Sequence, residues 1–166
     1  AGSLTQSVAV FALGGYGRRE LCLHSDIDLL ILFAGVIDQE DERFLHKFLN
    51  PIWDHGLTIG HHVREVSEGA GLDADNPEFL LALTDARPVV GDATLLDQFL
   101  GASDLALTNT RTLESLKGLI AERHGKYNDT LYQLEPDVKE SPGGLRDLFG
   151  AQTIAKLTDP ALLGQG

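Results

Sequence analysis

The chain has 166 residues, of which 43% are hydrophobic, enough to bury one compact core or a small core with an appended part. It holds no run of eighteen apolar residues and a single cysteine, Cys22, which excludes a membrane-spanning helix and an internal disulfide and fits a cytoplasmic location. The formal net charge is −12 at pH 7. We therefore expect no nucleic-acid partner, because tight non-specific binding needs clustered Lys and Arg, and no membrane partner.

The first hundred residues combine strand patterns with helix patterns. Short apolar or alternating runs predict strands over residues 7–13, 26–33 and 57–66; helices are predicted over 40–54, 77–84 and 92–100, and a polar turn over 16–21 that can open a short helix. Asn76 is a good N-cap for the second helix, with proline at the first helical position. Pro51 should kink or split the first helix.

The remaining residues are predominantly helical. A long amphipathic helix is predicted over residues 108–132, with Leu113, Leu116, Ile120, Tyr127 and Leu131 on one face, then a loop over 134–144 and a last helix over 145–157. The fold class is therefore α+β: an α/β core over residues 1–100 and a helical extension over 101–166 packed on it. The chain lacks methionine and begins at Ala1, so we expect a piece of a longer protein.

The segment over residues 13–33 carries the chemistry. Gly14 and Gly15 follow the first strand, and Asp26 and Asp28 begin the next. Alternation along a strand puts both carboxylates on one face, where they repel each other unless a cation lies between them. Mg²⁺ prefers such oxygen ligands and keeps positions open for phosphate. The glycines let a triphosphate approach their N–H groups, and the Ser25 hydroxyl could donate to a phosphate oxygen.

Each part of this segment is common by itself. A glycine pair usually forms a turn, and an Asp-x-Asp pair at a strand start is usually solvated. Their order, with a short turn between them and an apolar strand after them, resembles the polymerase β-like nucleotidyltransferases. That resemblance implies a small mixed sheet with flanking helices.

The motif sequences resemble a narrower family, the bacterial PII-protein uridylyltransferases. The similar blocks are GGYGR (residues 14–18), EL (20–21), SDIDLL (25–30), WDHGL (53–57), GHHVR (60–64), DAR (85–87), GD (91–92), LEPDVKE (134–140) and PGGLRD (142–147). The resemblance implies transfer of UMP from UTP to a tyrosine hydroxyl of a PII signal protein, with release of pyrophosphate, in nitrogen regulation. It implies Mg²⁺, as two ions, held by the catalytic and metal-binding residues Asp26 and Asp28. A chain of this length should neither hydrolyse the product nor sense glutamine.

One position departs from the family pattern. Thr58 stands where the family usually has Glu, and nucleotidyltransferases of this fold usually need a third carboxylate to activate the acceptor. Glu65, the one acid on the predicted third strand, lies on its apolar face, opposite the face with Thr58 and His62. Either another acid, Asp85 or Glu65, completes the site or the site is weakened.

Basic residues outside the motif are candidates for contact with phosphate. Arg18 follows the glycine turn and either touches phosphate or forms a structural salt bridge. Lys139 and Arg146 surround a Pro-Gly-Gly loop at a helix start, where anions are attracted, and either contact nucleotide or acceptor or brace the core. Asp85 and Arg87 are expected to form a structural ion pair at a helix end.

Two other functions stay open. A related nucleotidyltransferase could use another acceptor or another donor such as ATP, and the core motif does not separate these cases. A degenerate core could bind a nucleotide without transferring it, which Thr58 favours and the intact Asp26 and Asp28 oppose.

Overall fold

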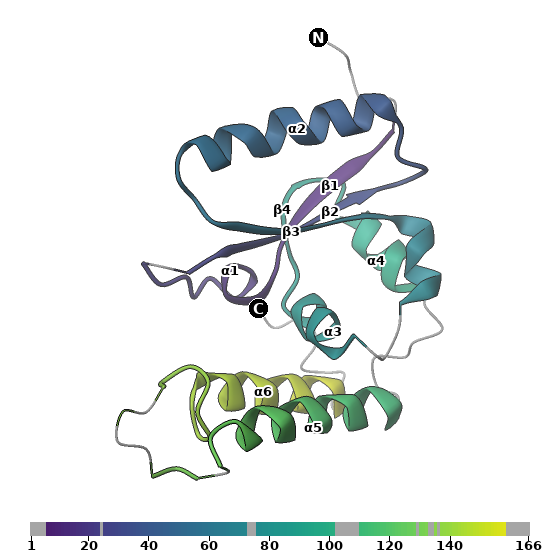
Figure 1. The fold of residues 1–166 in the computed structure, drawn as a ribbon. Helices are drawn as coiled ribbons and strands as arrows, with labels where there is room; N and C mark the ends of the chain where they lie inside the picture. The colour runs from purple at the N-terminus through teal and green to yellow at the C-terminus, as the bar shows by residue number, and fades with distance from the viewer. Residues whose placement is uncertain are drawn as a thin grey trace. The chain divides into compact units, whose positions relative to one another are not determined.

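The computed structural model describes residues 6–23, 25–72, 76–101, 110–128, 130–132, 135 and 137–158 (Figure 1). The chain divides into two compact units, Ala1–Leu72 with Asp85–Asp104, and Asp73–Thr84 with Leu105–Gly166. Residues 73–84 thus group with the C-terminal residues, and the division predicted after residue 100 stays a prediction. No helix in the described ranges is both long and apolar enough to cross a membrane.

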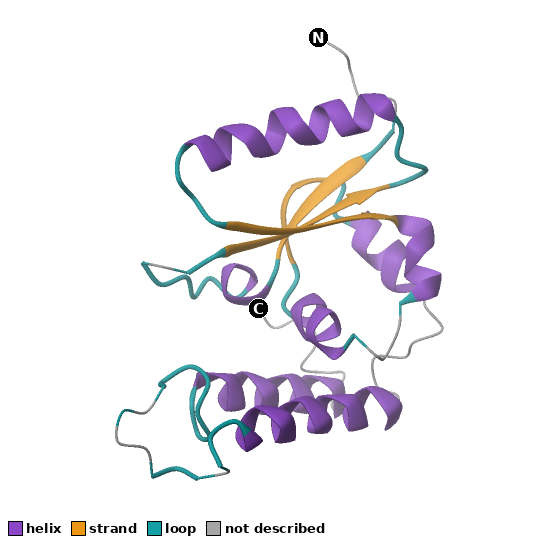
Figure 2. Cartoon of the chain, viewed as in Figure 1, coloured by secondary structure: helices purple, strands orange, loops and turns teal. Residues whose placement is uncertain are grey.

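The first unit is built on a four-stranded sheet with the strand order β3-β2-β1-β4. Figure 2 draws the strands in orange. The strands are β1 (Val8–Ala12), β2 (Ile27–Phe33), β3 (Ile59–Glu65) and β4 (Arg87–Gly91). The β2–β3 pair is parallel, whereas β1 runs antiparallel to both β2 and β4. This small mixed sheet with flanking helices confirms the predicted α+β fold, and β1, β2 and β3 match the three predicted strands.

β4 was not predicted from the sequence. It lies at an edge of the sheet and contains Pro88, and proline in a strand is confined to edges because it cannot donate a ladder hydrogen bond. Its neighbours Val89 and Val90 are both exposed, so the strand shows no alternation between a buried and an exposed face. The strand therefore shows no alternation of apolar and polar residues, and its proline argues against a strand in a sequence-based prediction.

Helix α2 (Gln39–Asp54) covers one face of the sheet (Figure 1). Its N-terminus has a capping box in which the carboxylates of Asp38 and Asp41 accept each other's backbone N–H. Buried residues of β1, β2 and α2 form the apolar cluster between them: Val10, Leu29, Ile31, Phe33 and Leu49. The helix runs through Pro51 to Asp54 without a break, so of the predicted kink or split the split is wrong and the kink stays a prediction; because Pro51 lies near the C-terminus of the helix, most of the hydrogen-bond ladder is untouched.

The other face of the sheet is covered by η1 (Val66–Gly71) and α4 (Thr94–Gly101), which contact each other (Figure 1). Phe99 of α4 is fully buried. A Cβ atom added to Gly69 would lie 1.9 Å from the Phe99 carbonyl oxygen, so this glycine is required for the close approach of the two helices.

The short helix α1 (Gly14–Gly17) directly follows β1, two residues earlier than the turn predicted at residue 16. It is held by the chain segment that precedes β4. The Arg18 guanidinium donates to the Asp85 carboxylate at 2.5 Å, and only 7% of the Asp85 side chain is exposed. Arg87 donates to the carbonyls of Tyr16 and Gly17 at 2.9 and 3.1 Å and lies over the Tyr16 ring. Asp85 therefore pairs with Arg18, in place of the predicted pairing with Arg87.

The second unit contains α3 (Pro77–Thr84), α5 (Thr110–Gly125) and α6 (Leu145–Thr158). Asn76 caps α3 as predicted, its side-chain oxygen accepting the Phe79 N–H at 3.2 Å. The helix predicted over residues 108–132 is wrong at its C-terminal end, since α5 stops at Gly125. The next three N–H groups donate to carbonyls three residues back, which tightens the last turn, and Asn128 then has a left-handed φ of 55°.

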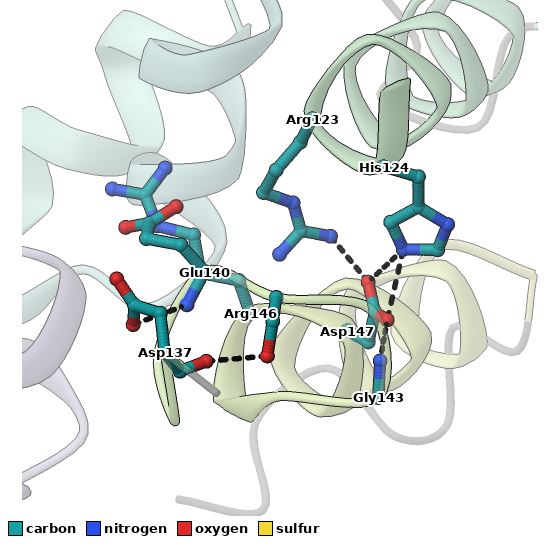
Figure 3. A network of polar contacts seen from close by, with 8 residues as sticks. Arg123, His124, Asp137, Glu140, Gly143, Arg146 and Asp147 are labelled. Carbon is teal, nitrogen blue, oxygen red and sulfur yellow. Dashed lines mark hydrogen bonds and ion pairs between the residues drawn. The ribbon is translucent and has the colours of Figure 1, made fainter. Parts of the chain in front are cut away.

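Asp147, in the first turn of α6, joins that helix to α5 (Figure 3). Its carboxylate accepts from Arg123, from His124 Nε2 at 2.9 Å and from the Gly143 N–H at 2.6 Å. Burial alone would raise the pKa of Asp147, but these hydrogen bonds and the charge of Arg123 outweigh burial and hold the pKa below its usual value. The ionised carboxylate therefore stabilises the second unit.

We predict that Arg18→Ala destabilises the protein by on the order of 3 kcal/mol, because it leaves the Asp85 carboxylate buried without this cation. Arg43→Ala is the control, since its pair with Glu40 is exposed and should contribute less than about 1 kcal/mol. Urea unfolding measures both variants. Adding Asp85→Asn to Arg18→Ala should restore part of the loss; equal losses for Arg18→Ala and Arg43→Ala would contradict the buried pair.

We also predict that Asp147→Asn lowers stability at neutral pH by about 1.5–3 kcal/mol, the usual range for a hydrogen bond to a charged group. Because the folded-state pKa of Asp147 is lowered, its contribution is complete above the ordinary carboxyl pKa of about 3.9 and is lost as pH falls through the folded value. The difference between variant and wild type should therefore shrink below about pH 4. Urea unfolding at several pH values, with the exposed Glu122→Gln as control, measures this; a pH-independent difference would rule it out.

Candidate functional site

Asp28 lies at the start of β2, where the strand passes between β1 and β3. It is paired in register with Gly60 of β3, and its carbonyl accepts the Leu13 N–H at 2.9 Å. A Cβ atom added to Gly60 would lie 2.6 Å from Asp28 Oδ1, and one added to Gly14 would lie 3.4 Å from Oδ2. Each carboxylate oxygen therefore lies against a residue without a side chain.

Asp26 lies immediately before β2 and is exposed, as is Asp28. Ile27 packs against the apolar cluster under α2, so alternation puts the Asp28 side chain on the opposite face of the sheet. The same alternation, extended by one pair, would place Asp26 beside Asp28. Their joint action on a metal stays a prediction.

Gly14 and Gly15 form the first turn of α1, next to Asp28. Gly14 has a φ of 50°, a left-handed conformation that favours glycine. The first N–H groups of a helix have no partner within the helix, so the turn can offer them to an anion. Ser25 lies in the loop before β2, where its hydroxyl accepts the Cys22 N–H at 3.0 Å. The predicted roles of these residues toward phosphate are chemically feasible and untested.

Arg18 is also a predicted nucleotide contact of this segment. Besides Asp85, its guanidinium donates to Glu20 at 3.0 Å. Both interactions give Arg18 a bracing role for the glycine turn, the second of the two roles that the sequence left open. Its contact with phosphate stays a prediction.

Of the two acids proposed as the third carboxylate, Glu65 lies far from Asp28 and Asp85 is held in an ion pair, so its role as the third carboxylate stays a prediction. Glu65 is at the far end of β3, paired with Phe33, five residues from the Asp28–Gly60 pair; at about 3.3 Å per residue it lies roughly 17 Å away along the strand. Its carboxylate accepts the Ile37 N–H at 3.0 Å. Asp85 is paired with Arg18. Thr58, two residues before Gly60, is exposed.

His62 is a neighbour of Asp28 that sequence reasoning did not assign to the site. The adjacent His61 points to the other face: its ring contacts Trp53 of α2 edge-on at 5.7 Å between ring centroids. The charge of Asp28 acts on the His62 imidazole. Burial, then the charge of Arg64, lowers the pKa of His62, while Asp28 opposes the shift. The imidazole is therefore neutral at neutral pH.

Lys139 and Arg146 belong to the second unit, around the N-terminus of α6. The N–H groups there already have acceptors: Gly143 donates to the Asp147 carboxylate, Gly144 to the Ser141 carbonyl, Leu145 to the Val138 carbonyl, Arg146 to the Lys139 carbonyl and Asp147 to the Gly144 carbonyl, at 2.6–3.1 Å. The Arg146 side chain pairs with Glu140 at 2.9 Å. The helix terminus thus offers no vacant amide from these residues to an anion. The nucleotide contact predicted for both side chains stays a prediction.

The donor set around Asp28 fits a magnesium ion that is shared with a nucleotide. Within the described part of the chain, no group of three or more His, Cys, Asp or Glu side chains could hold a metal. Mg²⁺ is usually bound through one or two carboxylates plus substrate phosphates, not by a cage of protein ligands. The exposed Asp26 and Asp28, with a side-chain-free cradle at Gly14 and Gly60, supply that arrangement.

Comparison with known proteins gives similarity along almost the whole chain. Curated proteins named bifunctional uridylyltransferase/uridylyl-removing enzyme are 37% identical over 92% of this chain in Burkholderia thailandensis, 40% over 90% in Nitrosospira multiformis and 38% over 97% in Cupriavidus metallidurans. The chain spans 18% of the length of each. A family model described as GlnD PII-uridylyltransferase matches residues 111–161.

A solved structure described as a toxin-antitoxin with AMP-PNP is similar at 17% identity and a TM-score of 0.36, over 78% of this chain and 90% of that one. The sequence similarity is the finding that places the chain: over almost its whole length it is similar to one part of the bifunctional uridylyltransferase/uridylyl-removing enzymes, the family that its motifs resemble.

Proposed function

We propose that this chain carries the nucleotide-transfer centre of a uridylyltransferase, which moves UMP from UTP to a tyrosine hydroxyl of a PII signal protein. The observation that carries the proposal is the Asp28 carboxylate lying between Gly14 and Gly60, beside the glycine turn that opens α1. The names of the relatives and of the family model support uridylyl transfer. The tyrosine acceptor and the PII partner rest on the motif resemblance.

In the proposed reaction the tyrosine oxygen forms a bond to the α-phosphorus of UTP. The bond from that phosphorus to the bridging oxygen breaks, pyrophosphate leaves with the electron pair, and the hydroxyl proton passes to solvent water. Asp26 and Asp28 would hold Mg²⁺, which when bound neutralises triphosphate charge and lowers the pKa of the acceptor hydroxyl. Gly14 and Gly15 let the phosphates approach the backbone. The contribution of the protein is therefore positioning and charge stabilisation.

A second candidate is a core that binds nucleotide with slow or no transfer. It is favoured by Thr58, by the position of Glu65 at the far end of β3 and by the pairing of Asp85 with Arg18. A related transferase with another donor or acceptor shares the same centre. Assays with each labelled NTP, with and without a PII protein, separate these cases.

We predict that Asp28→Asn abolishes UMP transfer and leaves the fold intact. The substitution removes a ligand charge from an exposed strand start, where it disturbs little packing. Transfer of label from UTP to a PII protein, with circular dichroism as the test of folding, measures the effect. Asp97→Asn, at an exposed position of α4, is the matched control. Wild-type turnover in Asp28→Asn would refute the two-carboxylate mechanism.

We predict that Thr58→Glu raises the transfer rate while the affinity for Mg-UTP stays unchanged. The new carboxylate would stand just before β3, two residues from Gly60, and help to remove the acceptor proton, for which general-base help contributes about 10²–10⁴-fold. Thr58→Gln has similar size without the charge and should give no gain. Equal or lower rates for Thr58→Glu, combined with a large loss in Asp85→Asn, would show instead that Asp85 completes the site.

A further inference from the structure

Gly60 lies directly against the Asp28 carboxylate. The two residues are paired in the parallel β2–β3 ladder. A Cβ atom at position 60 would lie 2.6 Å from Asp28 Oδ1 and 3.8 Å from its carboxyl carbon. Real Cβ atoms essentially never come so close to another heavy atom, so a side chain at residue 60 would force the carboxylate to move.

The backbone does not itself require glycine at this position. Gly60 is not among the described glycines with positive φ, which are Gly14, Gly56, Gly91 and Gly143. It is exposed on β3, an edge strand. Glycine inside a strand is unfavourable relative to alanine because it loses more conformational freedom on folding. Glycine weakens β3 at this position, although alanine could adopt the same backbone conformation. The presence of glycine here therefore has a cause other than backbone geometry.

The atoms near position 60 differ from those near the tightly packed glycines of the same unit. Cβ atoms at Gly17, Gly69 and Gly91 would collide with backbone atoms, at 2.1, 1.9 and 2.1 Å. Those three glycines are therefore required by the packing of the main chain. At Gly60, the described atoms within 4 Å of the added Cβ all belong to the Asp28 carboxyl group.

We propose that Gly60 is a positioning residue for the metal-binding carboxylate: the missing side chain leaves the space in which Asp28 Oδ1 lies, and so fixes the direction of the carboxylate. Gly14 gives looser support to the other oxygen, at 3.4 Å from its added Cβ. A methyl group at position 60 would turn the carboxylate away from β3, and the ion that Asp28 shares with Asp26 would lose the alignment of one ligand. The inference rests on the proposed function.

The test uses the full chain with Gly60→Ala, Asp28→Ala and the double variant. Gly71→Ala is the control, because an added Cβ there has no atom within 4 Å. Mn²⁺ affinity, measured by electron paramagnetic resonance with and without UTP, reports the site without any turnover. The midpoint of thermal unfolding reports the steric contact without any metal.

We expect Gly60→Ala to stay folded and to raise the Mn²⁺ dissociation constant about 10- to 100-fold, the usual effect of losing a group that orients a metal ligand. Its effect on the unfolding midpoint should be less favourable in the wild type than in Asp28→Ala, where the collision is absent and only the gain from replacing a strand glycine remains. Gly71→Ala should change neither the affinity nor the midpoint.

Unchanged Mn²⁺ affinity in Gly60→Ala would overturn the proposal, and so would an equal change of midpoint in both backgrounds. If Gly60→Ala does not fold, folding of the double variant supports the collision with Asp28, and failure of the double variant to fold overturns it. A wild type that binds no Mn²⁺, even with UTP, counts against the proposed function. The unfolding midpoints still decide whether Gly60 and Asp28 are sterically coupled.

Discussion

A carboxylate that holds a divalent ion needs space on the protein side and open solvent on the other, and the start of β2 provides both for Asp28. On the protein side, Gly14 and Gly60 leave room for its two oxygens. On the other side the residue is exposed, so a cation can reach it from solvent. The paired strands β1, β2 and β3 fix this position because they bring the end of β1 and the start of β3 to the same residue.

The glycine turn beside Asp28 would be poorly determined by its own sequence. A four-residue helix with three glycines has high conformational entropy to lose on folding. The segment before β4 supplies the missing restraint through the buried Arg18–Asp85 pair and the Arg87 hydrogen bonds to the carbonyls of α1. Residues 85–87 thus act on the site through the turn. This explains how blocks far apart in the sequence form one structural unit.

The sequence was sufficient where one local signal dominated. The apolar run of β2 and the Asn76 cap of α3 predicted their elements, and the candidate carboxylates lie at the expected strand start. β4 depends on pairing with a distant strand, and the C-terminal end of α5 depends on a tightened last turn, neither of which periodicity contains. The same limit applies to the partner of Asp85 and to Gly60, whose space is defined only when β2 and β3 are paired.

The most direct test of the account is a crystal structure with Mn²⁺, as a substitute for Mg²⁺, and a non-hydrolysable UTP analogue. The account predicts an anomalous scattering peak between Asp26 and Asp28, with oxygen ligands near the distance of about 2.1 Å that Mg²⁺ demands. The triphosphate should lie over the backbone of Gly14 and Gly15. A metal bound without Asp28, or a nucleotide bound away from the glycine turn, would contradict the account.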